Sequence, residues 1–351
     1  MKDVAIVDPN FAIETAIERE NLCFYDAEET PFQIYGIFRE NEYFRRIPED
    51  IARKVSPGVY VLHTHSAGGR VRFVTDSPYV AIKTIYEPEK NSHFALTGSA
   101  GFDMYEDICG ENRYLGTFIP PFDVKDGYEG VVDFSEWKER SITINFPLYS
   151  SVKKLYIGLK KDATLKMAMD YAIKRPVVFY GSSITQGGCA SKPGSSYESI
   201  LSQKFDFDYI NLGFSGNAKG EQEMVDYIKG LDMSVFVMDY DFNAPNAEHL
   251  SRTHSKMFET IRSAQPELPI IIMSRPSYYL TKPGEERRKI IENTYLEAVK
   301  RGDRNVYFLD GPKLMELVKD NGTVDGCHPT DSGFYSMAQA IGTVLETIWK
   351  L

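Results

Sequence analysis

Val177-Val178-Phe179-Tyr180-Gly181-Ser182-Ser183-Ile184-Thr185 is an apolar run that stops on Gly-x-Ser. A strand that is buried on both faces of a parallel sheet has such a continuous hydrophobic sequence. Because active sites of open α/β sheets lie beyond the carboxyl ends of their strands, we expect Ser183 on a turn where chemistry can occur. A serine after a strand is also a common helix cap or turn former, so this stretch alone leaves both interpretations open.

Four more apolar segments follow, at residues 209–212, 235–238, 269–273 and 305–309. Segments that could form helices separate them, and strands that alternate with helices predict a parallel sheet. The last predicted helix precedes the C-terminus and should bury one face, made of Phe334, Met337, Ala338, Ile341, Val344, Leu345 and Ile348. We therefore expect an α/β domain with five parallel strands over residues 170–351.

The first half of the chain has a different pattern, with short β-rich runs between turn residues. These runs cover residues 58–62, 70–74, 79–83, 130–134 and 141–145. Short strands at such spacing are typical of an antiparallel sandwich. A length of 351 residues also fits about two domains. We expect a jelly-roll-like β-sandwich over residues 1–165, ahead of the α/β domain.

A second polar segment, Asp325-Gly326-Cys327-His328-Pro329, lies just before the last predicted helix. A serine hydroxyl is a weak nucleophile and needs a base such as imidazole, which in turn needs a carboxylate to fix its tautomer. Asp325 and His328 could supply both groups from one loop. Asp, Gly and Pro are also ordinary turn residues, so a surface turn is the alternative.

Two other strand ends offer hydrogen-bond donors for a developing oxyanion. The segment at 209–217 runs into a Gly-rich loop, where the N–H of Gly216 could point at that oxygen. The segment at 235–243 ends on Asn243, whose side-chain amide could do the same. Gly216 could instead serve only a tight turn, and Asn243 could cap a helix that starts near Asn246.

Taken in order, these blocks resemble the SGNH (GDSL-type) hydrolases. The resemblance implies a flavodoxin-like domain in which Ser183 is the nucleophile, Asp325 and His328 complete a triad, and the oxyanion donors are Ser183, Gly216 and Asn243. Ser182 stands where the family has Asp. Asp241-Phe242-Asn243-Ala244 replaces the common Gly-x-Asn-Asp, which keeps Asn246 as the alternative to Asn243.

Gly101-Phe102-Asp103-Met104-Tyr105 is similar to the Gly-x-Asp-Leu-Tyr segment in the N-terminal β-domain of one SGNH subgroup. Asp103 and Tyr105 could brace the sandwich or bind substrate, and Tyr278 follows the fourth predicted strand on the active-site side. The resemblance implies a serine esterase that hydrolyses acetyl or other small acyl esters of carbohydrates. The alternatives are a lysophospholipase or thioesterase with a longer acyl pocket, an acyltransferase, and a non-catalytic carbohydrate-binding protein.

Composition restricts the partners. A net charge of −10 argues against nucleic acid, because phosphate-binding sites gather Lys and Arg. The four cysteines, Cys23, Cys109, Cys189 and Cys327, fit no metal-ligand spacing and are expected to be free thiols.

We therefore expect no metal and no cofactor. His63 and His65 could share a strand face and bind a metal, but an ordinary polar face is the favoured interpretation.

Location and assembly are less constrained. Residues 1–9 do not resemble a signal peptide, and no segment is long enough to cross a bilayer. The expected location is cytoplasmic, or secreted if a leader has been removed. The sequence leaves the oligomeric state and the roles of Cys189 and Cys327 open.

Overall fold

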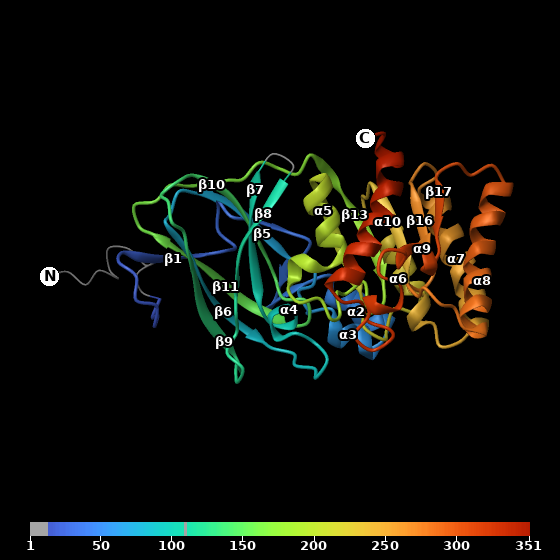
Figure 1. The fold of residues 1–351 in the computed structure, drawn as a ribbon, viewed down its shortest axis with the longest axis horizontal. Helices are drawn as coiled ribbons and strands as arrows, with labels where there is room; N and C mark the ends of the chain where they lie inside the picture. The colour runs from blue at the N-terminus through green and yellow to red at the C-terminus, as the bar shows by residue number, and fades with distance from the viewer. Residues whose placement is uncertain (1–12, 109–110) are drawn as a thin grey trace. The chain divides into compact units, whose positions relative to one another are not determined.

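The computed structural model describes residues 13–108 and 111–351, which form two compact units (Figure 1). Unit 1 holds the described residues of Met1–Arg45 and Thr64–Asp170, together with Lys192–Gly194. Unit 2 holds Arg46–His63, Tyr171–Ser191 and Ser195–Leu351. The two units differ from the expected domains 1–165 and 170–351 at two segments. Residues 46–63 belong to unit 2, and residues 192–194 belong to unit 1.

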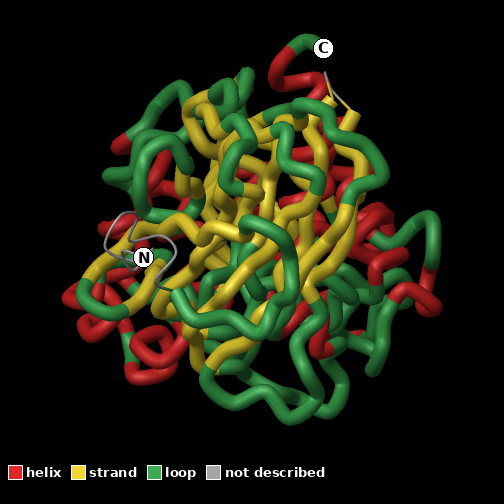
Figure 2. The backbone as a smooth tube through the Cα atoms, turned by 90° about the vertical axis from the view of Figure 1, so that its left-hand side faces the viewer, coloured by secondary structure: helices red, strands yellow, loops and turns green. Residues whose placement is uncertain are grey.

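Unit 1 is built on two antiparallel sheets, whose strands are yellow in Figure 2. One sheet has the order β1 (Leu22–Asp26), β11 (Ser151–Lys160), β6 (Tyr79–Glu87), β9 (Gly127–Asp133). The other has the order β12 (Leu165–Lys166), β5 (Arg70–Thr75), β10 (Arg140–Asn145), β7 (Phe102–Ile108), β8 (Glu111–Phe118), with β2 (Gln33–Tyr35) also paired to β5. A short hairpin, β3 (Phe38–Glu40) and β4 (Tyr43–Arg45), and the helix α4 (Leu96–Ser99) complete the unit.

The inward side chains of both sheets meet in one apolar cluster that includes Phe73, Ile82, Met104, Ile144 and Ile157. Because alternate residues of each strand point to opposite faces, one face of each sheet supplies this core. The expected β-rich N-terminal domain is confirmed.

Unit 2 contains a parallel sheet of five strands (Figure 1). Its order is β14 (Phe207–Gly213), β13 (Ile173–Gly181), β15 (Val235–Asp239), β16 (Ile270–Met273), β17 (Val306–Leu309). Numbered along the chain this is the flavodoxin-like order 2-1-3-4-5. The predicted five-stranded parallel sheet is therefore confirmed, and β13 delivers the Gly-x-Ser segment at its carboxyl end.

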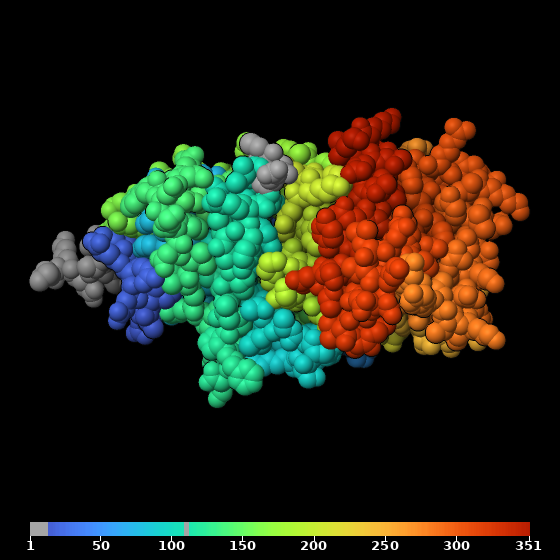
Figure 3. Space-filling view, in the orientation of Figure 1, coloured from blue at the N-terminus to red at the C-terminus, as the bar shows by residue number. Residues whose placement is uncertain are grey.

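Four helices of unit 2 lie between consecutive strands of this sheet: α5 (Tyr197–Phe205), α6 (Gln222–Ile228), α7 (Ala247–Ala264) and α8 (Lys282–Lys300). Two more, α9 (Gly311–Leu314) and α10 (Asp331–Trp349), follow β17. The short 3₁₀ turns η3 (Asp241–Asn243) and η4 (Lys319–Gly322) also belong to unit 2, whereas η2 (Pro193–Ser195) begins in the part of the chain that belongs to unit 1. The helix α10 buries the predicted apolar face, including Phe334, Met337 and Ile341, and its other side forms surface in Figure 3. Among the described residues, no helix combines the length and the apolar character that a membrane span requires.

The strand predicted at residues 58–62 is wrong, because this segment is helical. Two helices occur here, α2 (Glu49–Val55) and α3 (Pro57–Leu62). The hydroxyl of Ser56 accepts the N–H of Val59, and Pro57 occupies the first turn of α3, so local capping outweighs the β-propensity of the two valines. The metal-site alternative also loses its basis, since His63 caps α3 in unit 2 while His65 belongs to unit 1 and the two share no strand face.

Candidate active site

Ser183 lies on a tight turn at the carboxyl end of β13. The N–H of Gln186 donates to the carbonyl of Ser182 at 3.0 Å, and the N–H of Gly188 donates to the carbonyl of Ser183 at 2.8 Å. The hydroxyl of Ser182 accepts the N–H of Ile184 at 3.1 Å. Ser182 thus performs a turn-forming role. The turn leaves Ser183 itself 8% exposed.

The structure brings Ser183, His328 and Asp325 into one hydrogen-bonded chain. Ser183 Oγ lies 2.8 Å from His328 Nε2, and His328 Nδ1 lies 2.7 Å from Asp325 Oδ2. A carboxylate only accepts hydrogen bonds, so Nδ1 carries the imidazole proton and Nε2 is left to accept from the serine hydroxyl. This arrangement suits removal of the Ser183 proton by His328.

The loop around Asp325 holds this carboxylate ionised. Oδ1 of Asp325 accepts the N–H of Cys327 at 2.9 Å and the N–H of His328 at 2.8 Å. Burial by itself would raise the pKa of Asp325, but the hydrogen bonds from His328 and Cys327 outweigh it and lower the pKa to about 2. Gly326, at φ +83°, supplies the left-handed residue that lets the loop turn so tightly.

Gly216 follows β14 and leaves open space on its side-chain side. Its φ is +70°, and no atom lies within 4 Å of the position that a Cβ would occupy. Within the described part of the chain, the Gly216 N–H has no hydrogen-bond acceptor. Open space and an N–H without an acceptor are the properties expected of a backbone group that could donate to a ligand oxygen.

Asn243, and not Asn246, is the asparagine tied to this loop. Asn243 Nδ2 donates to the carbonyl of Phe214 at 2.8 Å, which leaves the second N–H of that amide for another acceptor. Asn246 caps α7 by accepting the N–H of His249 at 2.8 Å. The geometry thus separates the two roles that the sequence left open.

A buried carboxylate that the sequence analysis did not single out fixes η3. Asp241 is 1% exposed, and its Oδ1 accepts Arg287 Nε at 2.7 Å. Its Oδ2 accepts the backbone N–H of Arg275 at 2.8 Å, while Arg287 also donates to the carbonyl of Ala244 at 3.0 Å. The ion pair gives a physical reason for the departure from Gly-x-Asn-Asp, because Asp241 anchors the turn that carries Asn243.

Asp239 also connects the Ser183 turn to a neighbouring strand, which the sequence pattern did not indicate. At the end of β15 its Oδ2 accepts the hydroxyls of Thr185, at 2.9 Å, and Tyr197, at 3.2 Å. Burial raises the pKa of Asp239 to about 7, although both hydroxyls oppose this rise. Thr185 belongs to the Ser183 turn, so this carboxyl ties that turn to the neighbouring strand.

The three expected substrate-binding residues have different surroundings. Asp103 is fully buried, and its two oxygens accept Asn145 Nδ2 at 2.9 Å and the N–H of Gly194 at 2.8 Å. Tyr105 is 5% exposed and contacts Gly194, where an added Cβ would lie 2.3 Å from the tyrosine hydroxyl oxygen. The geometry therefore supports bracing within unit 1, and Asp103 offers a substrate no exposed atom.

Tyr278 lies beyond the carboxyl end of β16, on the side predicted. Its ring meets Tyr279 at a centroid distance of 5.0 Å, and Lys319 Nζ lies 5.7 Å from its centroid. The side chain is half-buried.

The described cysteines are free thiols, and Cys109 lies outside the described residues. Cys189 Sγ lies within 4.8 Å of a ring nitrogen of His328. Burial and then the charge of Asp325 raise the pKa of Cys189 to about 12, and the same two causes raise the pKa of Cys327 to about 11. Both shifts favour the protonated thiol at neutral pH.

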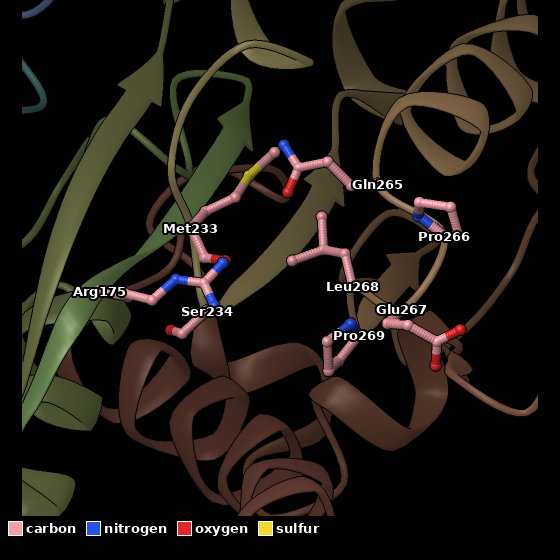
Figure 4. Close-up of a pocket in the computed structure, with 8 residues that line it drawn as sticks. All are labelled: Arg175, Met233, Ser234, Gln265, Pro266, Glu267, Leu268 and Pro269. Carbon is pink, nitrogen blue, oxygen red and sulfur yellow. The ribbon is translucent and has the colours of Figure 1, made fainter.

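A pocket lies at the amino ends of the strands, away from Ser183 and His328 (Figure 4). It has a volume of about 360 Å³ and is lined by Arg175, Met233, Ser234, Gln265, Pro266, Glu267, Leu268 and Pro269. Ser234 and Pro269 directly precede β15 and β16, so the pocket lies at the amino ends of the strands. Arg175 is engaged there by Asp232 at 2.7 Å. The carboxyl ends, which carry Ser183 and Asn243, are the side where parallel sheets bind substrates.

Comparisons with known proteins show which families the two halves of the chain match. Residues 174–346 match the model of the GDSL-like lipase/acylhydrolase family, and residues 22–165 match the GxDLY model, described as the N-terminus of SGNH-hydrolase-type esterases. Among curated proteins no match was found.

Solved structures with the same fold cover nearly the whole chain. A GDSL-like lipase structure from Bacteroides ovatus is 29% identical, with a TM-score of 0.85 over 94% of this chain and 98% of that one. A salicylyl-acyltransferase from a tetracycline biosynthetic pathway is 18% identical, with a TM-score of 0.75 over 95% and 99%. An acetyl xylan esterase from the rumen bacterium Butyrivibrio proteoclasticus is 13% identical, with a TM-score of 0.60 over 93% and 98%. The chain therefore combines a GDSL-like lipase/acylhydrolase domain with the GxDLY domain that is described as the N-terminus of SGNH-hydrolase-type esterases.

Proposed function

We propose that this protein is a serine esterase in which Ser183, His328 and Asp325 act as the catalytic triad. The observation that carries the proposal is the pair of contacts from His328, 2.8 Å to Ser183 Oγ and 2.7 Å to Asp325 Oδ2. The ionised Asp325 stabilises the imidazolium that forms when His328 accepts a proton.

The reaction has two halves. Ser183 Oγ attacks the ester carbonyl carbon while its proton passes to His328 Nε2, and the carbonyl oxygen becomes an oxyanion. The N–H groups of Ser183 and Gly216 and the amide of Asn243 bind that oxyanion. Collapse expels the alcohol, which takes the proton from His328 and leaves an acyl-serine. Water then attacks by the same route, releases the acid and restores Ser183.

The substrate that we propose is a carbohydrate carrying a short acyl group, with acetyl as the first candidate. The shared fold with an acetyl xylan esterase supports this choice as a likeness of fold. Net negative charge favours a neutral substrate over a polyanion. No step uses a metal or a cofactor.

The test is a hydrolysis screen on acetylated mono- and oligosaccharides, with wild type beside Ser183→Ala. Loss of the nucleophile should lower kcat by about three orders of magnitude, since only substrate binding and the oxyanion donors remain. A fluorophosphonate probe should label wild type on Ser183 and leave the variant unlabelled. Residual activity above a tenth of wild type would place the nucleophile elsewhere.

A further inference from the structure

Residues 46–63 come from the first half of the sequence but belong to the hydrolase unit. The N–H of Arg46 donates to the carbonyl of His63 at 3.0 Å, so the two ends of the segment lie side by side. Between them, α2 and α3 bury Ala52, Val55 and Val59 in the same apolar cluster as Phe214 and other residues beside the sheet. This segment therefore shares one apolar core with the strand that leads to Gly216.

Arg46, at the start of this segment, reaches that strand with its side chain. Its side chain is 1% exposed, and one terminal nitrogen donates to the carbonyls of Gly213 and, at 3.3 Å, Asn211. The other donates to the carbonyl of Leu62 at 2.6 Å, where α3 ends. A planar guanidinium can serve several carbonyls at once, which an ammonium on a flexible stem cannot do in the same fixed geometry.

The position of β14 explains why these carbonyls need a partner. Among the residues that the structure describes, β14 is an edge strand of the sheet and pairs only with β13. Asn211 and Gly213 are two residues apart, so their carbonyls point to the same side, away from β13. Phe214 N–H, one residue on, donates to Gly181 in β13 at 2.9 Å. Arg46 thus satisfies the open edge of the strand just before the loop begins.

Two of the three proposed oxyanion donors, Gly216 and Asn243, depend on Phe214. The guanidinium carbon of Arg46 lies 4.5 Å from the centroid of the Phe214 ring. The carbonyl of Phe214 accepts Asn243 Nδ2 at 2.8 Å and the N–H of Asn217 at 2.8 Å. Phe214 and Asn217 lie on either side of Gly216 along the loop. A shift of Phe214 would therefore displace Gly216 and Asn243 together.

We propose that Arg46 is a positioning residue of the oxyanion site: it fixes the end of β14 and the Phe214 ring, and through them the N–H of Gly216 and the amide of Asn243. This proposal rests on the proposed esterase function. It assigns the segment 46–63 a role in catalysis, although the segment lies far from the catalytic blocks in the sequence.

The experiment compares Arg46→Met and Arg46→Lys with a matched control, Arg262→Met. Arg262 makes similar hydrogen bonds at the amino ends of the strands. It donates to the carbonyls of Leu268 at 2.6 Å and Asn305 at 3.2 Å and to the carboxylate of Asp303 at 2.7 Å. All variants are first checked for a cooperative thermal transition, and kcat and KM are then measured on p-nitrophenyl acetate.

We expect Arg46→Met to lower kcat about a hundredfold, the size of losing one oxyanion donor, with KM changed less than about threefold. Arg46→Lys should recover part of kcat, and Arg262→Met should lose thermal stability while keeping kcat within about twofold of wild type. The proposal is overturned if folded Arg46→Met keeps kcat within threefold of wild type, or if Arg262→Met loses as much kcat.

Amide hydrogen exchange separates this proposal from the proposed function. The N–H groups of Asn217 and Ala218, which donate to Phe214, should exchange at least tenfold faster in Arg46→Met than in wild type. If wild type hydrolyses no ester but exchange still rises, the esterase function fails, and with it the catalytic role of Arg46, although Arg46 would still anchor the loop. Unchanged exchange overturns the role of Arg46 itself, whatever the activity of wild type.

Discussion

Asp325→Asn tests the triad most directly, because the substitution keeps most of the local structure. Oδ1 accepts two backbone N–H groups, and an asparagine oxygen can keep both. The contact that changes is the one between Oδ2 and His328 Nδ1, at 2.7 Å, where an NH₂ group would replace the acceptor. The amide then favours the imidazole tautomer with the proton on Nε2, which cannot accept the proton of Ser183.

The expected loss in kcat is about ten-thousand-fold, which corresponds to about 5.5 kcal/mol in the activation barrier. One charge-assisted hydrogen bond at a partly exposed site contributes only about 1 kcal/mol to the free energy of unfolding, so the melting temperature should fall by only about 2–4 °C. KM should stay close to wild type, because no contact with the substrate is removed.

The assay measures kcat, KM and the melting temperature of wild type, Asp325→Asn and a control, Asp320→Asn, which removes an exposed charge in η4. Since the folded pKa of Asp325 is below its ordinary value of 3.8, its carboxylate stabilises the fold above about pH 4 and this contribution disappears as the pH falls toward 2. The difference in melting temperature between wild type and Asp325→Asn should shrink over that range. If Asp325→Asn keeps more than a tenth of kcat, or loses only KM, Asp325 is not the carboxylate of the triad.

Three other predictions address different parts of the molecule. Asp239→Asn should flatten the decline in stability between about pH 4 and 7. The pKa of Asp239 in the folded protein is raised to about 7, so protonated Asp239 stabilises wild type and this contribution is lost as the carboxyl ionises. Melting temperatures of both proteins at several pH values check this, and parallel pH profiles would contradict it. Exhaustive chelation should leave kcat unchanged, since no proposed step needs a Lewis acid, whereas activity that is lost and then restored by zinc would overturn the serine mechanism. In a series from acetyl to octanoyl esters, kcat/KM should be highest at acetyl or propionyl; a rise toward octanoyl, where each buried methylene would contribute about 0.8 kcal/mol, would indicate the lysophospholipase or thioesterase alternative.

Much of the candidate site could be predicted from sequence because its parts are local. The run that ends at Ser183 is a buried strand and a turn, and both depend on neighbouring residues. Asp325 and His328 are three residues apart on one loop, so their contact needs no long-range folding. The side of the sheet was also predictable, because all parallel strands end at the same edge.

What the sequence determined was thus the set of short blocks: the strands, the loops at their ends and the residue types that suit acyl transfer. Only the tertiary structure decided which distant groups meet. Asn243 rather than Asn246 donates to the carbonyl of Phe214, and Asp241 forms an ion pair with Arg287 of α8. Arg46 donates to β14 from a segment that the sequence pattern assigned to the N-terminal domain. Periodicity and propensity act over a few residues, whereas these contacts depend on which carbonyls an edge strand leaves open and which charges are buried together. Those conditions exist only once the chain has packed.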